Sequence, residues 1–159
     1  MNALLKSAKI LDEKSDFNNK IQDILIADGR ILKIGDTLKN PKKFQVIDFD
    51  NLHISQGWFD SSVCFGEPGY EDRETIKNGL NVAAKSGFTS VALQANTQPV
   101  MDQHSAIAFA KAQSYNTATR LLPVGALTVN SEGTHLAEIY DMSMAGSVAF
   151  GDYKKSISN

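Results

Sequence analysis

The sequence predicts an α/β protein in which a small β-structured segment precedes a parallel sheet. Two apolar runs, at residues 21–27 and 30–35, flank Asp28 and Gly29, the residue pair that favours a type I′ hairpin turn. From residue 57 onward, strand patterns alternate with helix patterns, which is typical of right-handed parallel crossovers. Four such strands are present, whereas a closed parallel barrel needs eight and about 250 residues. We therefore expect two domains, at residues 1–54 and 55–159, the second either part of a barrel or a small doubly wound domain complete in itself.

The first domain is expected to be a small β-structure. Besides the hairpin, residues 4–11 and 45–49 have apolar patterns that predict strands. No histidine, glycine-rich loop or carboxylate cluster in this part of the sequence suggests catalysis. We interpret this domain as a scaffold.

The second domain is predicted to contain four strands and three helices in alternation. The expected strands lie at residues 59–65, 88–95, 120–128 and 147–150, and the expected helices at 71–86, 105–115 and 134–144. Gly87 is expected to end the first helix, because glycine readily adopts the left-handed conformation that follows a helix. Asp102 is expected to cap the N-terminus of the second helix, and the third helix should end before Gly146.

Composition describes an ordinary globular chain. Of 159 residues, 42% are hydrophobic and 21% are charged, which is enough apolar material for one core. The formal charge of -2 gives no basic field for phosphate backbones, so we expect no nucleic-acid partner. The single cysteine, Cys64, excludes an internal disulfide and a metal site made of cysteines alone. Without a long uninterrupted apolar run, we expect no membrane association and a cytoplasmic location.

Residues 59–65 are expected to form a buried interior strand that runs directly into a ligand-binding loop. Because side chains alternate along a strand, Asp60, Ser62 and Cys64 should share one face. Such a row of small polar groups is unusual in a buried strand. A simpler interpretation of Cys64 is that it fills space in the core as a small apolar side chain.

At these residues the chain resembles the dihydroorotases of the cyclic amidohydrolase superfamily. In that family the strand typically reads Asp-x-His-x-His and continues as Arg-Glu-Pro-Gly-Tyr/Phe-Glu. This chain keeps Asp60 and the sequence Glu67-Pro68-Gly69-Tyr70-Glu71. It has Ser62 and Cys64 at the two histidine positions, and Gly66 at the position of the arginine that binds substrate.

The resemblance extends over nearly the whole chain in the right order. The sequence Asn96-Thr97-Gln98-Pro99-Val100 is similar to the Asn-Thr-x-Pro-Val loop that follows the second strand in the family. The sequence Ala145-Gly146-Ser147-Val148-Ala149-Phe150-Gly151-Asp152 is similar to the run that ends the fourth strand. The resemblance implies the N-terminal half of a (β/α)8 amidohydrolase barrel preceded by a small β-sandwich segment.

The resemblance also implies the hydrolysis of a cyclic amide with zinc, a chemistry for which these residues are poorly suited. A neutral hydroxyl such as that of Ser62 is a poor zinc ligand. Cys64 and Asp152, which lies where some family members carry a bridging carboxylate, would supply two ligands, fewer than a catalytic zinc requires. Asn96 keeps the family's second substrate-binding position. We therefore assign no catalytic residue and expect no cofactor, with zinc only if the metal site survives.

Three interpretations remain open at this point. The leading one is a catalytically degenerate dihydroorotase-like protein related to pyrimidine biosynthesis, with aspartate carbamoyltransferase as a partner implied by the resemblance. Homo-oligomerisation or association with the remaining half of a barrel is the other expected partnership. The second interpretation is an active amidohydrolase with a reduced metal site containing Cys64 and Asp152. The third is a self-contained small-molecule binding domain that uses Asn96 and the loop at Glu67.

Overall fold

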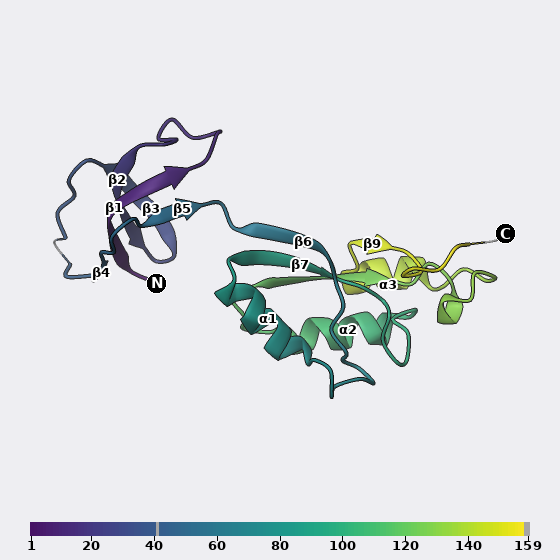
Figure 1. Ribbon diagram of the computed structural model, residues 1–159. Helices are drawn as coiled ribbons and strands as arrows, with labels where there is room; N and C mark the ends of the chain where they lie inside the picture. Colours follow the sequence, from purple (N-terminus) through teal and green to yellow (C-terminus); the bar gives the residue numbers. More distant parts are fainter. Residues whose placement is uncertain (41, 158–159) are drawn as a thin grey trace. The chain divides into compact units, whose positions relative to one another are not determined.

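The computed structural model describes residues 1–40 and 42–157 and divides the chain into two compact units, Met1–Gln56 and Gly57–Asn159 (Figure 1). Each unit has its own sheet and its own apolar core. Within the described residues, no helix is both long and apolar enough to cross a membrane.

The first unit is a five-stranded sheet in which β1 is central. Its strands are β1 (Ala3–Leu11), β2 (Ile21–Ala27), β3 (Arg30–Gly35), β4 (Gln45–Ile47) and β5 (His53–Ser55). The order is β3-β2-β1-β4, and β5 pairs in parallel with the other end of β1. The predicted hairpin is confirmed, because Asp28 and Gly29 have φ values of 51° and 74°, as a type I′ turn requires. The short β5 was not predicted.

A buried carboxylate stabilises the irregular part of this sheet. Asp23 on β2 is 1% exposed and accepts hydrogen bonds from the N–H groups of Ser7 at 3.0 Å and Leu38 at 2.9 Å. Its other partner is the ammonium group of Lys6. Burial acts to raise the pKa of Asp23, but these hydrogen bonds and the positive charge of Lys6 outweigh it, so the pKa lies below its ordinary value.

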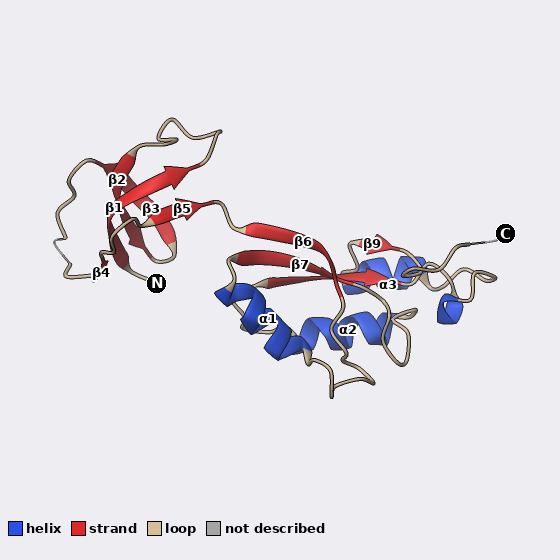
Figure 2. Cartoon of the chain, in the orientation of Figure 1, coloured by secondary structure: helices blue, strands red, loops and turns tan. Residues whose placement is uncertain are grey.

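The second unit is a parallel four-stranded sheet with helices on one face (Figure 2). The strands follow in the order β6-β7-β8-β9, as the alternating pattern predicts. Their bounds are β6 (Trp58–Val63), β7 (Phe88–Leu93), β8 (Arg120–Gly125) and β9 (Ala149–Phe150). The helices are α1 (Ile76–Lys85), α2 (His104–Gln113), α3 (Ile139–Ala145) and the short 3-10 helix η1 (Val129–Ser131).

The core of this unit lies between the sheet and the helices. It contains Val91, Leu93 and Leu121 from the strands, packed with apolar side chains of all three α-helices. Phe59, Ser90 and Arg120 are neighbours in the pairing register, and they lie on the face of the sheet that points away from the helices. Phe59 is 57% exposed, so the described residues leave this end of that face uncovered.

The prediction of a buried interior strand at residues 59–65 is wrong. Strand β6 lies at an edge of the described sheet, and Trp58 and Phe59 are 58% and 57% exposed. The strand ends at Val63, and its register against β7 shifts between Asp60 and Val63. The shift interrupts the regular alternation expected from Asp60 to Cys64. An apolar run therefore identified the strand but not its number of neighbours.

Two predicted helices begin later than expected because their first residues form turns. Helix α1 begins at Ile76 instead of residue 71, and the Thr75 side chain caps it by accepting a hydrogen bond from the Asn78 N–H at 3.2 Å. Helix α3 begins at Ile139 instead of residue 134, because Leu136 pairs with Thr128 in an isolated β-bridge. The predicted helix ends are confirmed at Gly87 and Gly146, whose φ values are 91° and 104°.

The predicted N-cap of α2 is also wrong. Gln103 occupies the N-cap position and makes no side-chain capping bond. Asp102 instead accepts a hydrogen bond from the backbone N–H of Asn130 at 2.8 Å. The carboxylate therefore connects the loop before α2 to the loop that contains η1.

Candidate functional site

The candidate site lies where the loops after β6, β7, β8 and β9 leave the sheet. The carboxyl ends of parallel strands meet at one edge, and ligands of open or closed parallel sheets bind there. Four loops reach this edge, at residues 64–75, 94–103, 126–138 and 151–157. The candidate site residues from the sequence, Ser62, Cys64, Asn96 and Asp152, lie on or next to these loops.

The end of β6 presents Ser62 and Cys64 to solvent. Ser62 donates its backbone N–H to the side chain of Asp60 at 2.9 Å, a contact within the irregular part of the strand. Cys64 is an exposed free thiol, so the interpretation of it as a buried apolar filler is wrong. Its side chain lies just beyond the last residue of the strand.

The loop after β6 folds tightly back onto Gly66. The Gly66 N–H donates to the carbonyl oxygen of Glu74 at 2.9 Å, and the Gly66 carbonyl accepts from the Tyr70 N–H at 2.7 Å. A Cβ atom added to Gly66 would lie 1.9 Å from the Tyr70 carbonyl oxygen, closer than any non-bonded approach allows. The backbone of the loop thus fills the space into which a side chain at this position would have to extend.

Glu67 attaches the same loop to helix α1. Its Oε2 atom accepts a hydrogen bond from the N–H of Ile76, the first residue of the helix, at 2.8 Å. A carboxylate is favoured at a helix N-terminus, where N–H groups lack intrahelical partners and the helix dipole is positive. Glu67 is therefore a structural residue.

Two further contacts order the tip of this loop. Arg73 places its guanidinium carbon 4.2 Å from the centre of the Tyr70 ring, a cation–π contact. Glu71 accepts a hydrogen bond from the Gly69 N–H at 2.9 Å, and this bond lowers the pKa of the Glu71 carboxyl. Contacts between residues of the loop therefore stabilise its conformation.

Asn96 lies in a cavity of about 210 Å³ at the edge where the loops meet. Its Oδ1 atom is buried and accepts no hydrogen bond from any residue that the structure describes. Buried polar atoms are nearly always hydrogen-bonded, and an unpaired one costs about 1–3 kcal/mol. The cavity is lined by residues from all four loops: Tyr70, Asn96, Thr97, Gln98, Val100, Ser131, Tyr153 and Lys155.

Lys155 brings a positive charge to this cavity. Within residues 1–40 and 42–157, no carboxylate lies within 4.0 Å of its ammonium group. The cavity therefore combines an acceptor that lacks a donor with an ammonium group that lacks a counter-ion. This arrangement suits a small ligand with both an N–H group and a negative charge.

Sequence reasoning identified Asn96 but missed Ser131, Tyr153 and Lys155. These residues reach the cavity only because the loops after β8 and β9 fold toward the loop after β7. No local pattern marks them: Ser131 ends the short helix η1, and Tyr153 and Lys155 lie in the polar stretch after β9. Their role follows from the packing of segments that are distant in the sequence.

Asp152 is committed to hydrogen bonds with the loop after β8. It is 8% exposed, and its Oδ1 atom accepts from the N–H groups of Leu127 and Thr128, both at 3.0 Å. Its Oδ2 atom accepts a hydrogen bond from the hydroxyl of Thr128. A carboxylate held in this way fixes the end of β9 against the neighbouring loop and has few lone pairs left for a cation.

The residues at the site do not fit a catalytic zinc ion. Ser62 offers a neutral hydroxyl, Cys64 one exposed thiol, and Asp152 a carboxylate whose oxygens already accept hydrogen bonds. In the part of the chain that the structure describes, no three His, Cys, Asp or Glu side chains form a group that could hold a metal ion. The three histidines, all exposed, are on β5, at the first turn of α2 and after η1: His53, His104 and His135.

Sequence comparisons show which family the chain belongs to. The model of the dihydro-orotase-like family matches residues 53–159. The dihydroorotase of Pelotomaculum thermopropionicum is 39% identical over 161 residues, covering 100% of this chain and 37% of that protein. The dihydroorotase of Solibacter usitatus is 35% identical, covering 96% of this chain and 35% of that protein. The chain thus spans less than two fifths of the length of these curated relatives.

Structural comparisons match this fold to parts of longer solved proteins. The L-hydantoinase (dihydropyrimidinase) of Arthrobacter aurescens matches 94% of this chain and 32% of its own, with a TM-score of 0.75 and 20% identity. A dihydroorotase crystal structure matches 94% of this chain and 41% of its own, with a TM-score of 0.60 and 16% identity. The predicted fold, part of a (β/α)8 barrel behind a small β segment, is confirmed by these likenesses.

Proposed function

Because the chain belongs to the dihydro-orotase-like family, we propose that it is a dihydroorotase-like protein of pyrimidine biosynthesis that has kept the framework and lost hydrolysis. Membership of the family rests on the match over residues 53–159. The proposed loss of catalytic activity rests on the chemistry of the residues at the edge of the sheet.

The observation that carries the proposal is the closed loop at Gly66. The family pattern has a long cationic side chain at this position, and here the Tyr70 carbonyl oxygen occupies the space that a Cβ would need. Loss of one side chain could be reversed by a single substitution. In its present conformation the loop has no room for a side chain at Gly66, so restoring the contact would also require a different backbone.

Asp152 supports the same proposal from the other side of the site. Its carboxylate bonds the backbone of Leu127 and Thr128, so it is explained completely by the structure of the loop. Ser62 and Cys64 offer a hydroxyl and a thiol where the family pattern has imidazoles. These donors do not fit a zinc ion.

What the site retains is the capacity to bind a small ligand. Asn96 offers a buried oxygen to an N–H donor, and Lys155 offers an ammonium group to an anion. Tyr70 and Tyr153 contribute aromatic side chains to the lining. The proposed role is therefore binding without turnover.

Turnover assays test the proposal directly. The purified chain is assayed with dihydroorotate and with carbamoyl aspartate in the presence of zinc, beside the Pelotomaculum thermopropionicum dihydroorotase as a positive control. We expect turnover by the control alone. Zinc-dependent turnover by this chain would overturn the proposal, and its loss in Cys64→Ala would favour an amidohydrolase with a reduced metal site.

We also propose that the chain works as a scaffold in assembly with aspartate carbamoyltransferase. Two features support an assembly role: β6 and β9 lie at the two edges of the described parallel sheet, and Trp58 and Phe59 are exposed on β6. Sedimentation of the chain with and without aspartate carbamoyltransferase tests this role. A stable complex is expected. Sedimentation of this chain alone as a dimer, or unchanged as a monomer, would contradict that choice of partner.

A further inference from the structure

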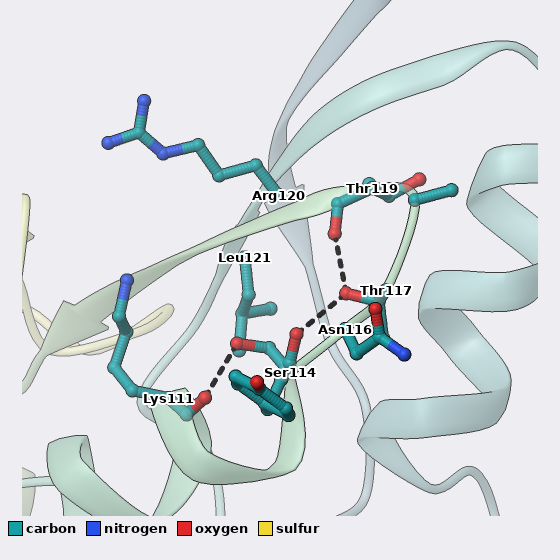
Figure 3. Close-up of a pocket in the computed structure, with 9 residues that line it drawn as sticks. Lys111, Ser114, Asn116, Thr117, Thr119, Arg120 and Leu121 are labelled. Atoms are coloured by element: carbon teal, nitrogen blue, oxygen red, sulfur yellow. Dashed lines mark hydrogen bonds between the residues drawn. The ribbon is translucent and has the colours of Figure 1, made fainter. Parts of the chain in front are cut away.

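A second cavity, of about 380 Å³, lies at the opposite end of the second unit's sheet from Asn96. It is formed by the last turn of α2, the loop that follows and the first residues of β8 (Figure 3). Asn96 follows the carboxyl end of β7, whereas Arg120 is the first residue of β8. The two cavities share no lining residue.

The hydroxyl groups of this cavity are used to hold the loop. Ser114 donates to the carbonyl oxygen of Lys111 at 2.8 Å, and Thr119 donates to that of Phe88 at 2.7 Å. The Thr117 hydroxyl lies 2.8 and 2.9 Å from the carbonyl oxygens of Ser114 and Thr119 and so spans the loop (Figure 3). With these protons committed, the side-chain donors that remain for a ligand belong to Lys111, Tyr115, Asn116 and Arg120.

Lys111 and Arg120 give the cavity a local excess of positive charge. Their side chains extend toward the same side of the loop (Figure 3). No Asp or Glu lines the cavity, and among the described residues no carboxylate lies within 4.0 Å of either cation. The whole chain carries a formal charge of -2, so this excess does not follow from composition.

The structure restricts the position of Lys111. A Cβ atom added to Gly146, which follows α3, would lie 3.7 Å from its Cε atom and 3.9 Å from its Cδ atom. The aliphatic stem therefore runs beside the end of α3, with the ammonium group beyond it. The loop bonds described above fix the backbone that leads into Arg120, the first residue of β8. The stem of Lys111 is thus placed before any ligand arrives, which lowers the entropy cost of binding.

We propose that this cavity binds the phosphate group of a small molecule. A guanidinium fork and an ammonium group, together with the amide and phenol donors of the loop, match a group whose several oxygens all accept hydrogen bonds. Tyr115 is 86% exposed, so its ring can stack on a flat ring attached to the phosphate. Free inorganic phosphate and an aromatic phosphate ester share this chemistry, and the experiment separates them.

The test is a titration of isotope-labelled protein, followed through the backbone amide resonances of residues 111–121. Inorganic phosphate, phenyl phosphate and, at matched ionic strength, sodium chloride are the probes. We expect saturable changes with both phosphates, tighter binding of phenyl phosphate, and no saturable change with chloride. Lys111→Gln and Arg120→Gln should each weaken phosphate binding about tenfold, the loss of one charge-assisted contact.

Lys85→Gln is the matched control, because Lys85 lies in the last turn of α1, as Lys111 lies in the last turn of α2, and is outside the cavity. This variant should bind phosphate as the parent does. Tyr115→Ala should keep the affinity for inorganic phosphate and lose the advantage of phenyl phosphate. Thermal unfolding of each variant identifies any that fails to fold. Absence of saturable changes, equal weakening by Lys85→Gln, or equal response to chloride would overturn the proposal.

Discussion

The carbonyl oxygen of Tyr70 lies 1.9 Å from the place that a Cβ atom would take on Gly66. The two residues are also joined by a hydrogen bond of 2.7 Å from the Tyr70 N–H to the Gly66 carbonyl. The glycine is thus part of a closed turn. The position at which the family pattern has its substrate-binding arginine has become a position where backbone meets backbone.

Substitution of Gly66 should therefore destabilise the protein instead of restoring a binding contact. We expect Gly66→Ala and Gly66→Arg to lower the free energy of unfolding by about 1–3 kcal/mol, the usual cost of forcing atoms into a filled space. Urea unfolding measures this. Gly151→Ala is the control, because an added Cβ there meets no atom within 4 Å, and it should change little. Dihydroorotate binding by a stable Gly66→Arg variant would contradict this account of the loop.

The contact of Glu67 with α1 predicts a graded effect. Glu67→Ala removes the acceptor of the Ile76 N–H and should cost about 1 kcal/mol, as the loss of a helix N-terminal partner does. Glu67→Gln keeps an oxygen acceptor and loses only the charge beside the helix dipole, so it should cost less. Urea unfolding of both variants checks the order. Equal stability of all three proteins would show that Glu67 has no structural role.

Asp152 should behave as a structural carboxylate. Asp152→Ala leaves the N–H groups of Leu127 and Thr128 without their acceptor and should lower the free energy of unfolding by about 1–3 kcal/mol. Asp72→Ala, at an exposed position that makes no side-chain hydrogen bond among those described, is the control and should be neutral. A drop in bound metal with unchanged stability would contradict the structural role and support a ligand role.

The unpaired Oδ1 atom of Asn96 should lower the free energy of unfolding of the ligand-free protein. Asn96→Leu replaces a buried oxygen that lacks a donor with an apolar group of similar size, so we expect a gain of about 1 kcal/mol. Thr97→Val is the matched comparison. Its hydroxyl donates to the Pro99 carbonyl at 2.8 Å, so its loss should be destabilising. Thermal unfolding of the two variants should shift in opposite directions, and a destabilised Asn96→Leu would show that Asn96 has an important partner in the folded protein.

The lowered pKa of Asp23 predicts how the stability of the first unit changes at low pH. The pKa of Asp23 is lower in the folded protein than its ordinary value of 3.8, so the ionised carboxylate stabilises the fold above that value. This stabilisation is lost as pH falls below 3.8 through the pKa of the folded state. Asp23→Asn should therefore be less stable at neutral pH and lose less stability in acid. Urea unfolding followed across this range checks the slope, and parallel pH profiles of parent and variant would contradict it.

The order of elements could be predicted from the sequence because local chemistry determines it. Asp28 and Gly29 specify the hairpin, and Gly87 and Gly146 end helices where glycine accepts a positive φ. Helix starts were harder to predict. The Thr75 cap and the Glu67 contact, which fix the start of α1, depend on how a loop folds, and Asp102 bonds Asn130 across the structure.

The candidate site could be predicted only in part for the same reason. Asn96 was found because it belongs to a loop sequence with a recognisable pattern, whereas Lys155 joins it only through the packing of distant loops. The exposure of β6 could not be seen either, since an apolar run does not reveal whether a strand has one neighbour or two.

The metal content of the purified chain, measured after exposure to zinc and removal of loosely bound ions, tests the central claim most directly. If Ser62, Cys64 and Asp152 form no zinc site, the chain should retain far less than one zinc ion per molecule, and Cys64→Ala should retain the same amount. One tightly held zinc ion per chain, lost in Cys64→Ala, would contradict the account.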